Sequence, residues 1–283
     1  EPEIEPDPIE PEPIEPELEP EPFTFVRENL VGYFEFNNNL SASIGTAVLE
    51  CLTNTNTQAY PTYPIFRFNS SIKLLPRITS PYQEGYYLKI TNLNYIQKIT
   101  VSFWFKDLEN LFTQKKLIQL YGFTNPIMIW LKETETTWST PVEGTELLNE
   151  NDKKYNLFFY HATYPTGTIE TSGTFELRKN NSYFISISAN FFTPSTYQFK
   201  IYVNSQLDIN QTINSSYTFS LYEARIGGYL NSMIDDLRFY DKCLSQIDIQ
   251  KLFEYEPYYN IEPELEPEPI EPKPEGEPDP EPE

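Results

Sequence analysis

The chain has 283 residues with 42 acidic and 20 basic side chains and one histidine, so its formal net charge is −22. Ten acids lie in residues 1–22 and ten acids with one lysine lie in residues 261–283, which leaves 22 acids against 19 bases, a charge of −3, for the body between them. A body without a basic stripe argues against nucleic acid as a partner, and no apolar run approaches the roughly 20 residues that span a bilayer.

Two proline-rich tails flank the body. The units IEPDP, IEPEP and IEPEL follow one another over residues 4–18, and IEPEL, EPEP and IEPKP follow over residues 261–274. Because proline fixes its own φ and biases its predecessor toward extended geometry, residues 1–22 and 260–283 are predicted to be acidic, polyproline II-like repeat strands. Their composition also fits a disordered acidic linker. The chain lacks an initiator Met and a signal peptide, so we expect a mature fragment or one period of a tandem polymer.

Residues 1–22 and 261–283 contain no Ser, Thr or Asn, so a sugar coat on them would require hydroxylated proline. The candidate acceptors are the prolines of both tails: Pro2, Pro6, Pro8, Pro11, Pro13, Pro16, Pro20, Pro22, Pro263, Pro267, Pro269, Pro272, Pro274, Pro278, Pro280 and Pro282. In the body, N-x-S/T sequons predict N-glycosylation if the protein is secreted. The five sequons are at Asn39, Asn69, Asn180, Asn210 and Asn214.

The two cysteines, Cys51 and Cys243, leave two alternatives open. One is a disulfide that joins the start of the body to its end and implies an oxidising compartment, and this is the preferred one. The other is a pair of buried free thiols.

Residues 23–259 are predicted to form one all-β domain. Apolar and polar side chains alternate in KITVSFWFK (98–106), SYFISISAN (182–190) and YQFKIYVN (197–204), and this period of two is typical of antiparallel strands. The number of such segments indicates a sandwich of two packed sheets. One short helix is expected near the end of the body, where Ser245 and Asp248 resemble a capping box.

Four segments resemble laminin-G-like, concanavalin A-like jelly rolls. They are LVGYFEFN (30–37), ITVSFWFK (99–106), IYVNS (201–205) and the closing stretch IGGYLNSMIDDLRFYDKCLSQIDIQKLF (226–253). The chain departs from the family pattern where Asn37 takes the place of Asp, Ser205 that of Gly and Cys243 that of Ala. The resemblance covers about residues 23–255 and implies a two-sheet jelly-roll sandwich with one short C-terminal helix.

The same resemblance implies a candidate metal site, because members of this family often hold calcium through loop carboxylates and carbonyls. Asp235 and Asp236 lie in the closing motif and are the candidate ligands. The alternative is that this pair forms hydrogen bonds at a strand end. The sequence implies no cofactor other than a structural calcium ion.

The sequence offers little for catalysis. The retaining glycosidases of this superfamily need acids at alternate strand positions, and ETETTW (133–138) has Glu133 and Glu135 but Thr137 in the third place. His161 is the only histidine, so neither a His-based triad nor a multi-His zinc site is available within one chain. We therefore expect that this protein is not an enzyme. Trp138 and Tyr164, in predicted loops, are candidates for stacking on a glycan.

Two functions remain. The preferred hypothesis is a non-enzymatic extracellular structural module that self-associates, as the repeating unit or protomer of a glycosylated surface fibre or coat built on Glu-Pro strands. The alternative is a secreted or surface-anchored carbohydrate-binding or adhesive domain in which the Glu-Pro tails are spacers. Both place the protein outside the cell or at its surface.

Overall fold

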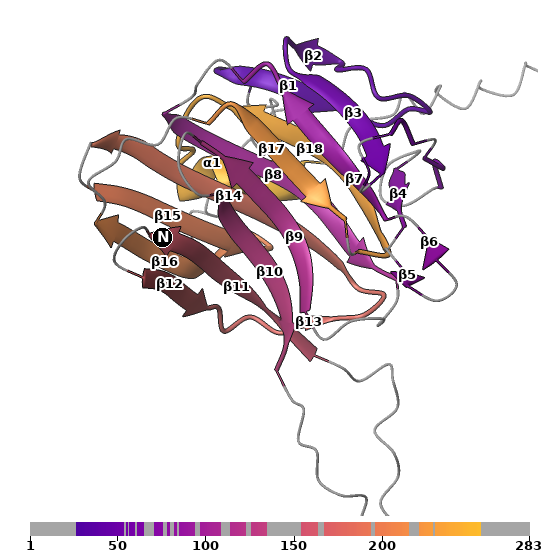
Figure 1. Cartoon of the computed structure of the whole chain (residues 1–283). Helices are drawn as coiled ribbons and strands as arrows, with labels where there is room; N and C mark the ends of the chain where they lie inside the picture. Colours follow the sequence, from indigo (N-terminus) through magenta and orange to yellow (C-terminus); the bar gives the residue numbers. More distant parts are fainter. Residues whose placement is uncertain are drawn as a thin grey trace, which may run out of the picture.

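The computed structural model describes residues 27–255 with internal gaps. The gaps are residues 54, 56, 60, 65–70, 76–77, 80–81, 84, 94–96, 109–113, 123–125, 135–153, 164–166, 194–195, 215–220 and 229. Both tails, and with them the proline acceptors and the repeat strands at 1–22 and 260–283, lie outside the described residues. In the described part, two antiparallel sheets pack face to face, which confirms the predicted all-β sandwich (Figure 1).

The first sheet, sheet A, carries both the first and the last strand of the domain side by side. In spatial order its strands are β16 (Gln206–Asn214), β15 (Thr196–Val203), β14 (Ser182–Thr193), β8 (Lys98–Asp107), β18 (Ser232–Tyr240), β1 (Leu30–Phe34) and β2 (Ile44–Gly45), with β4 (Ile72–Leu74) paired to β18. The second sheet, sheet B, runs β12 (Gly167–Ser172), β11 (Lys154–Thr163), β10 (Ile127–Glu133), β9 (Gln114–Tyr121), β17 (Glu223–Gly227), β7 (Tyr86–Thr91) and β3 (Val48–Thr53), with β13 (Leu177–Arg178) paired to β11. A small hairpin joins β5 (Ile78–Thr79) to β6 (Tyr82–Gln83).

The order of the strands shows that the chain passes repeatedly between the sheets. In sheet A, β18 lies between β8 and β1, and in sheet B, β17 lies between β9 and β7. Every one of these neighbours is antiparallel. These neighbours are distant in sequence, so long connections between the sheets join them rather than simple hairpins. Connections of this kind are typical of a jelly-roll sandwich.

The core lies between the sheets and is built from the inward half of each alternating strand. Phe103 on β8 and Ile185 on β14 are fully buried neighbours in register. Aromatic rings cross the gap between the sheets, as where Phe159 of β11 meets Phe199 of β15 at 5.1 Å between centroids. Burying a side chain of this size stabilises the fold by about 1.5–3 kcal/mol, so this inward set supplies most of the driving force.

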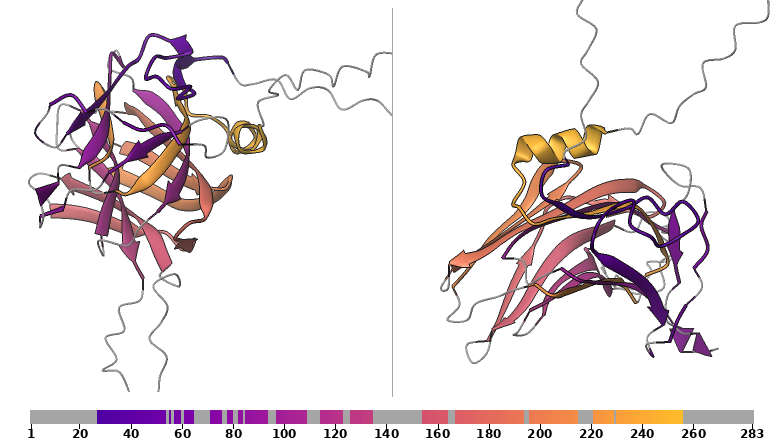
Figure 2. Two further views of the ribbon diagram at one scale, coloured as in Figure 1. Left: turned by 90° about the vertical axis from the view of Figure 1, so that its right-hand side faces the viewer. Right: turned by 90° about the horizontal axis from the view of Figure 1, so that it is seen from above.

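The predicted helix is α1 (Gln246–Glu254), and it covers the outer face of sheet A (Figure 2). The Ser245 hydroxyl accepts a hydrogen bond from the Asp248 amide at 3.1 Å, and the Asp248 carboxylate accepts from the Ser245 amide at 3.2 Å, which completes a capping box. Ile249 and Leu252 of the helix pack with outward-facing Trp104 of β8 in a second cluster of buried side chains. The part of the outer face of sheet A around Trp104 is therefore buried as well.

No disulfide joins the cysteines: both Cys51 and Cys243 are free thiols. Cys51 lies on β3 in the core between the sheets, and burial raises the pKa of its thiol to about 12. Cys243 follows β18, and its thiol donates a hydrogen bond to the Ala189 carbonyl of sheet A at 3.1 Å. The preferred prediction of a disulfide is therefore wrong. Cys51 lies in the core between the sheets, whereas Cys243 lies after β18 and contacts the Ala189 carbonyl.

Candidate functional site: the outer face of sheet B

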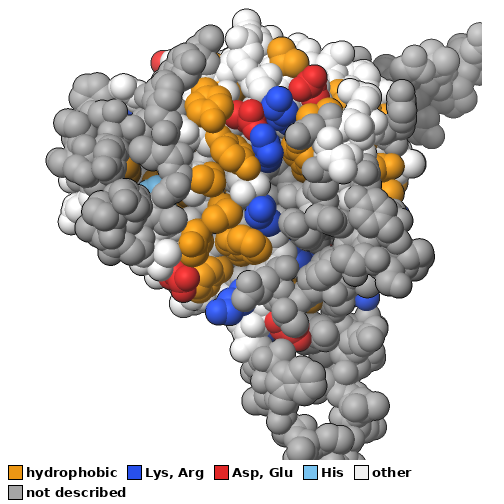
Figure 3. All heavy atoms as spheres, viewed as in Figure 1, with side chains coloured by type: hydrophobic (Ala, Val, Ile, Leu, Met, Phe, Trp, Pro, Cys, Tyr) orange, Lys and Arg blue, Asp and Glu red, His pale blue; other side chains and the backbone are white. Residues whose placement is uncertain are grey.

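The outer face of sheet B is the candidate site, because α1, the one helix among the described residues, lies on the other sheet. On β10, Ile127, Ile129 and Leu131 are buried in the core, so the residues between them point outward. Twelve outward side chains from five strands make up what we call the sheet B face: Tyr87, Lys89, Lys116, Gln119, Tyr121, Met128, Trp130, Lys132, Phe158, Tyr160, Glu223 and Arg225. Figure 3 shows hydrophobic side chains on this face with Lys and Arg among them.

Strand register brings these side chains into rows that cross the sheet. Trp130 of β10 is paired with Lys116 of β9 on one side and with Phe158 of β11 on the other. In the next row, Met128 is paired with Gln119 and Tyr160. Directly opposed side chains lie about 5 Å apart at Cβ, so each row is a continuous strip of aromatic and polar groups.

Cationic side chains stack on the aromatic rings of the face. The Arg225 guanidinium lies 4.6 Å from the Tyr121 ring centroid and 5.3 Å from that of Tyr87. The Lys116 ammonium lies 5.4 Å from the Trp130 ring, and that of Lys132 lies 4.9 Å from the Phe158 ring. These contacts favour the observed ring orientations, and each is worth about 0.5–1 kcal/mol where solvent reaches it.

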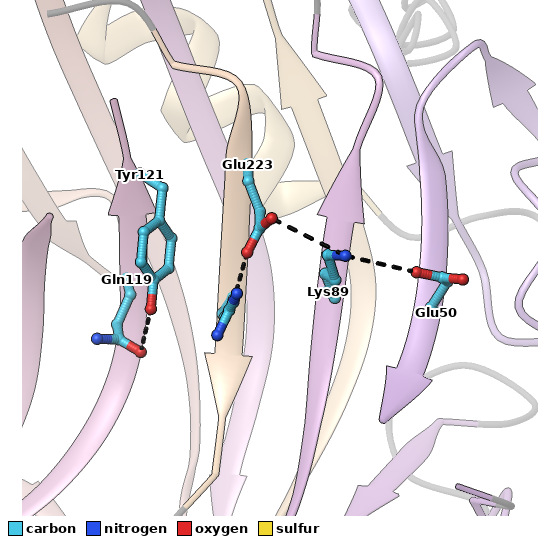
Figure 4. Close-up of polar contacts among 6 residues, drawn as sticks. Glu50, Lys89, Gln119, Tyr121 and Glu223 are labelled. Atoms are coloured by element: carbon cyan, nitrogen blue, oxygen red, sulfur yellow. Dashed lines mark hydrogen bonds and ion pairs between the residues drawn. The ribbon is translucent and has the colours of Figure 1, made fainter. Parts of the chain in front are cut away.

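A chain of charges crosses the β17 side of the face (Figure 4). The Arg225 Nε donates to Glu223 Oε1 at 2.5 Å, and the Lys89 ammonium lies 4.0 Å from carboxylate oxygens of both Glu223 and Glu50. On β9, the Tyr121 hydroxyl donates to Gln119 Oε1 at 3.2 Å. Polar groups are thus positioned between the rings, which is the combination that sugar recognition uses.

Lys116 lies in the middle of the face in a partly desolvated position. Burial lowers its pKa from the ordinary value, and repulsion from the Arg225 guanidinium lowers it further. An anion bound near Lys116 would offset both effects, so this part of the face is suited to a negatively charged group.

The residues that the sequence singled out for chemistry do not gather at this face. His161 is only 4 % exposed because it points into the core from β11, and burial lowers its pKa. Glu133 ends β10 opposite Tyr155, whereas Glu135 and Thr137 lie outside the described residues. The predicted stacking residues Trp138 and Tyr164 also lie outside them.

The two aspartates of the closing motif are buried in sheet A. Asp236 adopts a left-handed φ of 53° at a bulge in β18, a conformation that Asp accepts more readily than most residues. Its carboxylate lies 2.6 Å from the Arg238 guanidinium, and Asp235 Oδ1 accepts a hydrogen bond from the Asp236 amide at 2.8 Å. Among the residues that the structure describes, no three His, Cys, Asp or Glu side chains are grouped to hold a metal ion. Calcium binding by this pair stays a prediction.

Four of the five sequon asparagines fall on exposed positions. They are Asn39, Asn180, Asn210 and Asn214, while Asn69 lies outside the described residues. Exposure is a requirement for modification and does not test it, so N-glycosylation also stays a prediction.

The sheet B face was not predicted from the sequence, because the candidates for sugar stacking were aromatic residues in predicted loops. The signal was present in IMIWLKE (127–133) and NLFFYH (156–161), where Trp130, Phe158 and Tyr160 alternate with core residues. An alternating strand has two faces, and only the tertiary structure shows which outward face lacks a covering helix among the described residues.

The described residues form a two-sheet, jelly-roll-type β-sandwich. The sequence matches no protein-family model and no curated protein. Among solved structures, the binding domain of Paraclostridial Mosquitocidal Protein 1 is similar with a TM-score of 0.54 at 14% identity, over 80% of this chain and 52% of that one. The receptor-binding domain of botulinum neurotoxin type G has a TM-score of 0.53 at 12% identity, over 80% and 51%.

A third similar structure comes from botulinum neurotoxin type C, whose cell entry depends on interaction with two ganglioside molecules. Its TM-score is 0.51 at 18% identity, over 80% of this chain and 50% of that one. This chain therefore spans about half the length of the toxin domains it resembles. At such low identity the comparisons show a shared fold. No helix in the described part of the chain qualifies as a membrane span.

Proposed function

We propose that this protein is a non-catalytic carbohydrate-binding or adhesive domain, secreted or held at a cell surface, which binds a saccharide on the sheet B face. The observation that carries the proposal is the group of Trp130, Phe158 and Tyr160, from two neighbouring rows, with Lys116 and Arg225 on a sheet face that no helix of the described residues covers. An aromatic ring stacks on the apolar face of a sugar, and neighbouring polar groups bind its hydroxyls.

The strand pairing and the cation–π contacts around the aromatic rings favour this function over a merely structural one. Each aromatic residue lies on a strand paired on both sides, and cation–π contacts favour the orientations that the rings of Trp130 and Tyr121 adopt without a ligand. Preorganisation of this kind lowers the entropic cost of binding. From β11 to β7 the face crosses four strand spacings, about 19 Å, which accommodates an oligosaccharide.

Two further points support the proposal. The closing segment at 226–253 resembles laminin-G-like jelly rolls, and one protein of similar fold interacts with gangliosides. The fibre hypothesis rests on the tails, which lie outside the described residues, so self-association into a glycosylated fibre stays a prediction.

A glycan array probed with the full chain tests the proposal. We expect binding to a defined set of saccharides, and Trp130→Ala should weaken it by about tenfold or more, as expected for a central aromatic anchor. The matched control is Ile247→Ala, which removes a 68%-exposed apolar side chain from α1 on the opposite sheet. Circular dichroism must show that both variants are folded. Absence of array binding, or equal loss in both variants, would contradict the proposal.

A further inference from the structure

The centre of the sheet B face is more positive than its edges. Lys116 and Lys132 occupy the middle strands β9 and β10, where they stack on Trp130 and Phe158. Of the acids around them, Glu50 is on edge strand β3 and Glu170 is on edge strand β12, whereas Glu223 of the face, on β17, is paired with Arg225. A ligand that carries carboxylates would therefore be attracted to the middle of the face.

The chain itself contains the complementary charge. Residues 1–22 hold ten acids and no base, whereas the body carries only −3 in total. Opposite charges of this density attract over about 10 Å at moderate ionic strength. Each molecule thus carries one acidic segment, residues 1–22, for every sheet B face.

The predicted conformation of this segment also suits the face. A polyproline II strand repeats every three residues, about 9.3 Å, and alternate strands of a sheet lie about 9.6 Å apart. If such a segment lay across sheet B, its three-residue repeat would nearly match the spacing of every second β-strand. Residues three apart in the segment would then contact alternate β-strands in equivalent orientations. Surfaces lined by aromatic residues recognise proline-rich segments because polyproline II loses little entropy on binding.

The positions of the described chain ends favour a tail that comes from a second molecule. Glu28 is 3.6 Å from Lys242 in an ion pair, and the Asp241 amide donates to the Asn29 carbonyl at 2.9 Å, so the N-terminal end lies beside the end of β18 in sheet A. The C-terminal end leaves α1 on the outer face of the same sheet. A tail of the same molecule would have to pass around the sandwich, whereas the tail of a neighbour can approach sheet B directly.

We propose that the acidic tail at residues 1–22 of one molecule binds the sheet B face of another, with its carboxylates on Lys116 and Lys132 and its prolines on Trp130 and Phe158. The contact is heterologous, since tail and face are different surfaces. Repeated from molecule to molecule it forms rings or open chains. The tail would also compete with a saccharide for the same face.

Sedimentation velocity of the full chain tests this inference. We expect association that grows with protein concentration at low salt and that is lost at about 0.5 M NaCl, where charges are screened. A synthetic peptide of residues 1–22 should dissociate the assemblies, and the same peptide with every acid replaced by its amide should not.

The decisive variant is Lys116→Glu/Lys132→Glu, which should weaken association about tenfold or more. Its matched control is Lys98→Glu/Lys251→Glu, which changes the net charge equally on the sheet A side and should leave association unchanged. Equal effects of both variants, a monomer at every concentration, or compaction independent of concentration would each overturn the inference. If the array shows saccharide binding while the peptide does not bind, the inference fails and the proposed function stands.

Discussion

Replacement of Arg238 by Met tests how the closing motif is stabilised. Arg238 is fully buried, and its guanidinium lies 2.6 Å from the Asp236 carboxylate between the rings of Tyr33 and Tyr255, at 5.1 Å and 5.0 Å. Removing one partner of a buried ion pair leaves an uncompensated charge and costs about 3–5 kcal/mol. Asp236 can escape part of this cost by taking up a proton, so the cost grows by at most about 1.4 kcal/mol per pH unit above its pKa of about 6. We therefore expect Arg238→Met to lower the free energy of unfolding by about 2–3 kcal/mol at about pH 8.

The cost should depend on pH. Burial raises the pKa of Asp236 to about 6 although Arg238 opposes the shift, so without Arg238 the pKa rises further. The folded state then binds the Asp236 proton more tightly than the unfolded chain, and the stability linked to that proton is present at low pH and lost as the pH rises through the folded pKa. The cost of Arg238→Met should accordingly be small at about pH 5 and full at about pH 8.

Urea unfolding followed by tryptophan fluorescence at both pH values measures the cost. The control is Arg238→Met/Asp236→Asn, which removes both charges, keeps a residue suited to the left-handed φ, and should recover most of the loss. A cost below about 1 kcal/mol at pH 8, or a cost that is the same at both pH values, would refute this reasoning.

Three other predictions follow from single residues. His161 is the only histidine and burial lowers its pKa, so one NMR titration should show a midpoint below about 6.5 in the folded protein and near 6.5 in urea; an unshifted midpoint would place the ring in solvent. Ser245→Ala removes the α1 cap and should cost about 0.5–2 kcal/mol in urea unfolding, whereas Ser245→Asp should cost little. Calcium binding by Asp235 and Asp236 predicts that added Ca²⁺ raises the thermal midpoint and that EDTA reverses the rise, whereas an unchanged midpoint would show that Arg238 alone is the cation of Asp236.

The fold could be predicted from the sequence because two local signals agree with the tertiary structure. Period-two alternation in residues 98–106 places Phe103 inward, and the same inward set forms the core. Ser245 and Asp248 lie three residues apart and cap the helix where they predict it. Each signal depends only on neighbours in the chain, so no knowledge of distant contacts was needed.

The candidate site could not be predicted in the same way. Trp104 and Trp130 both point outward from alternating strands, yet Trp104 lies beneath α1 and Trp130 remains partly exposed. The difference arises from a helix that begins 142 residues after Trp104, and the alternation of residues within a strand contains no information about it. The same holds for the two cysteines. The sequence left a disulfide and two free thiols open, and only the tertiary structure shows that Cys51 and Cys243 are both free.

The most direct test of the central claim is oxidative footprinting of the full chain with and without the strongest saccharide from the glycan array. We predict protection of Trp130, Tyr121 and Tyr160 on the sheet B face, with Trp104 beneath α1 unchanged. Protection confined to α1 or to the outer face of sheet A, with Trp130 oxidised equally in both samples, would show that this face is not the binding site.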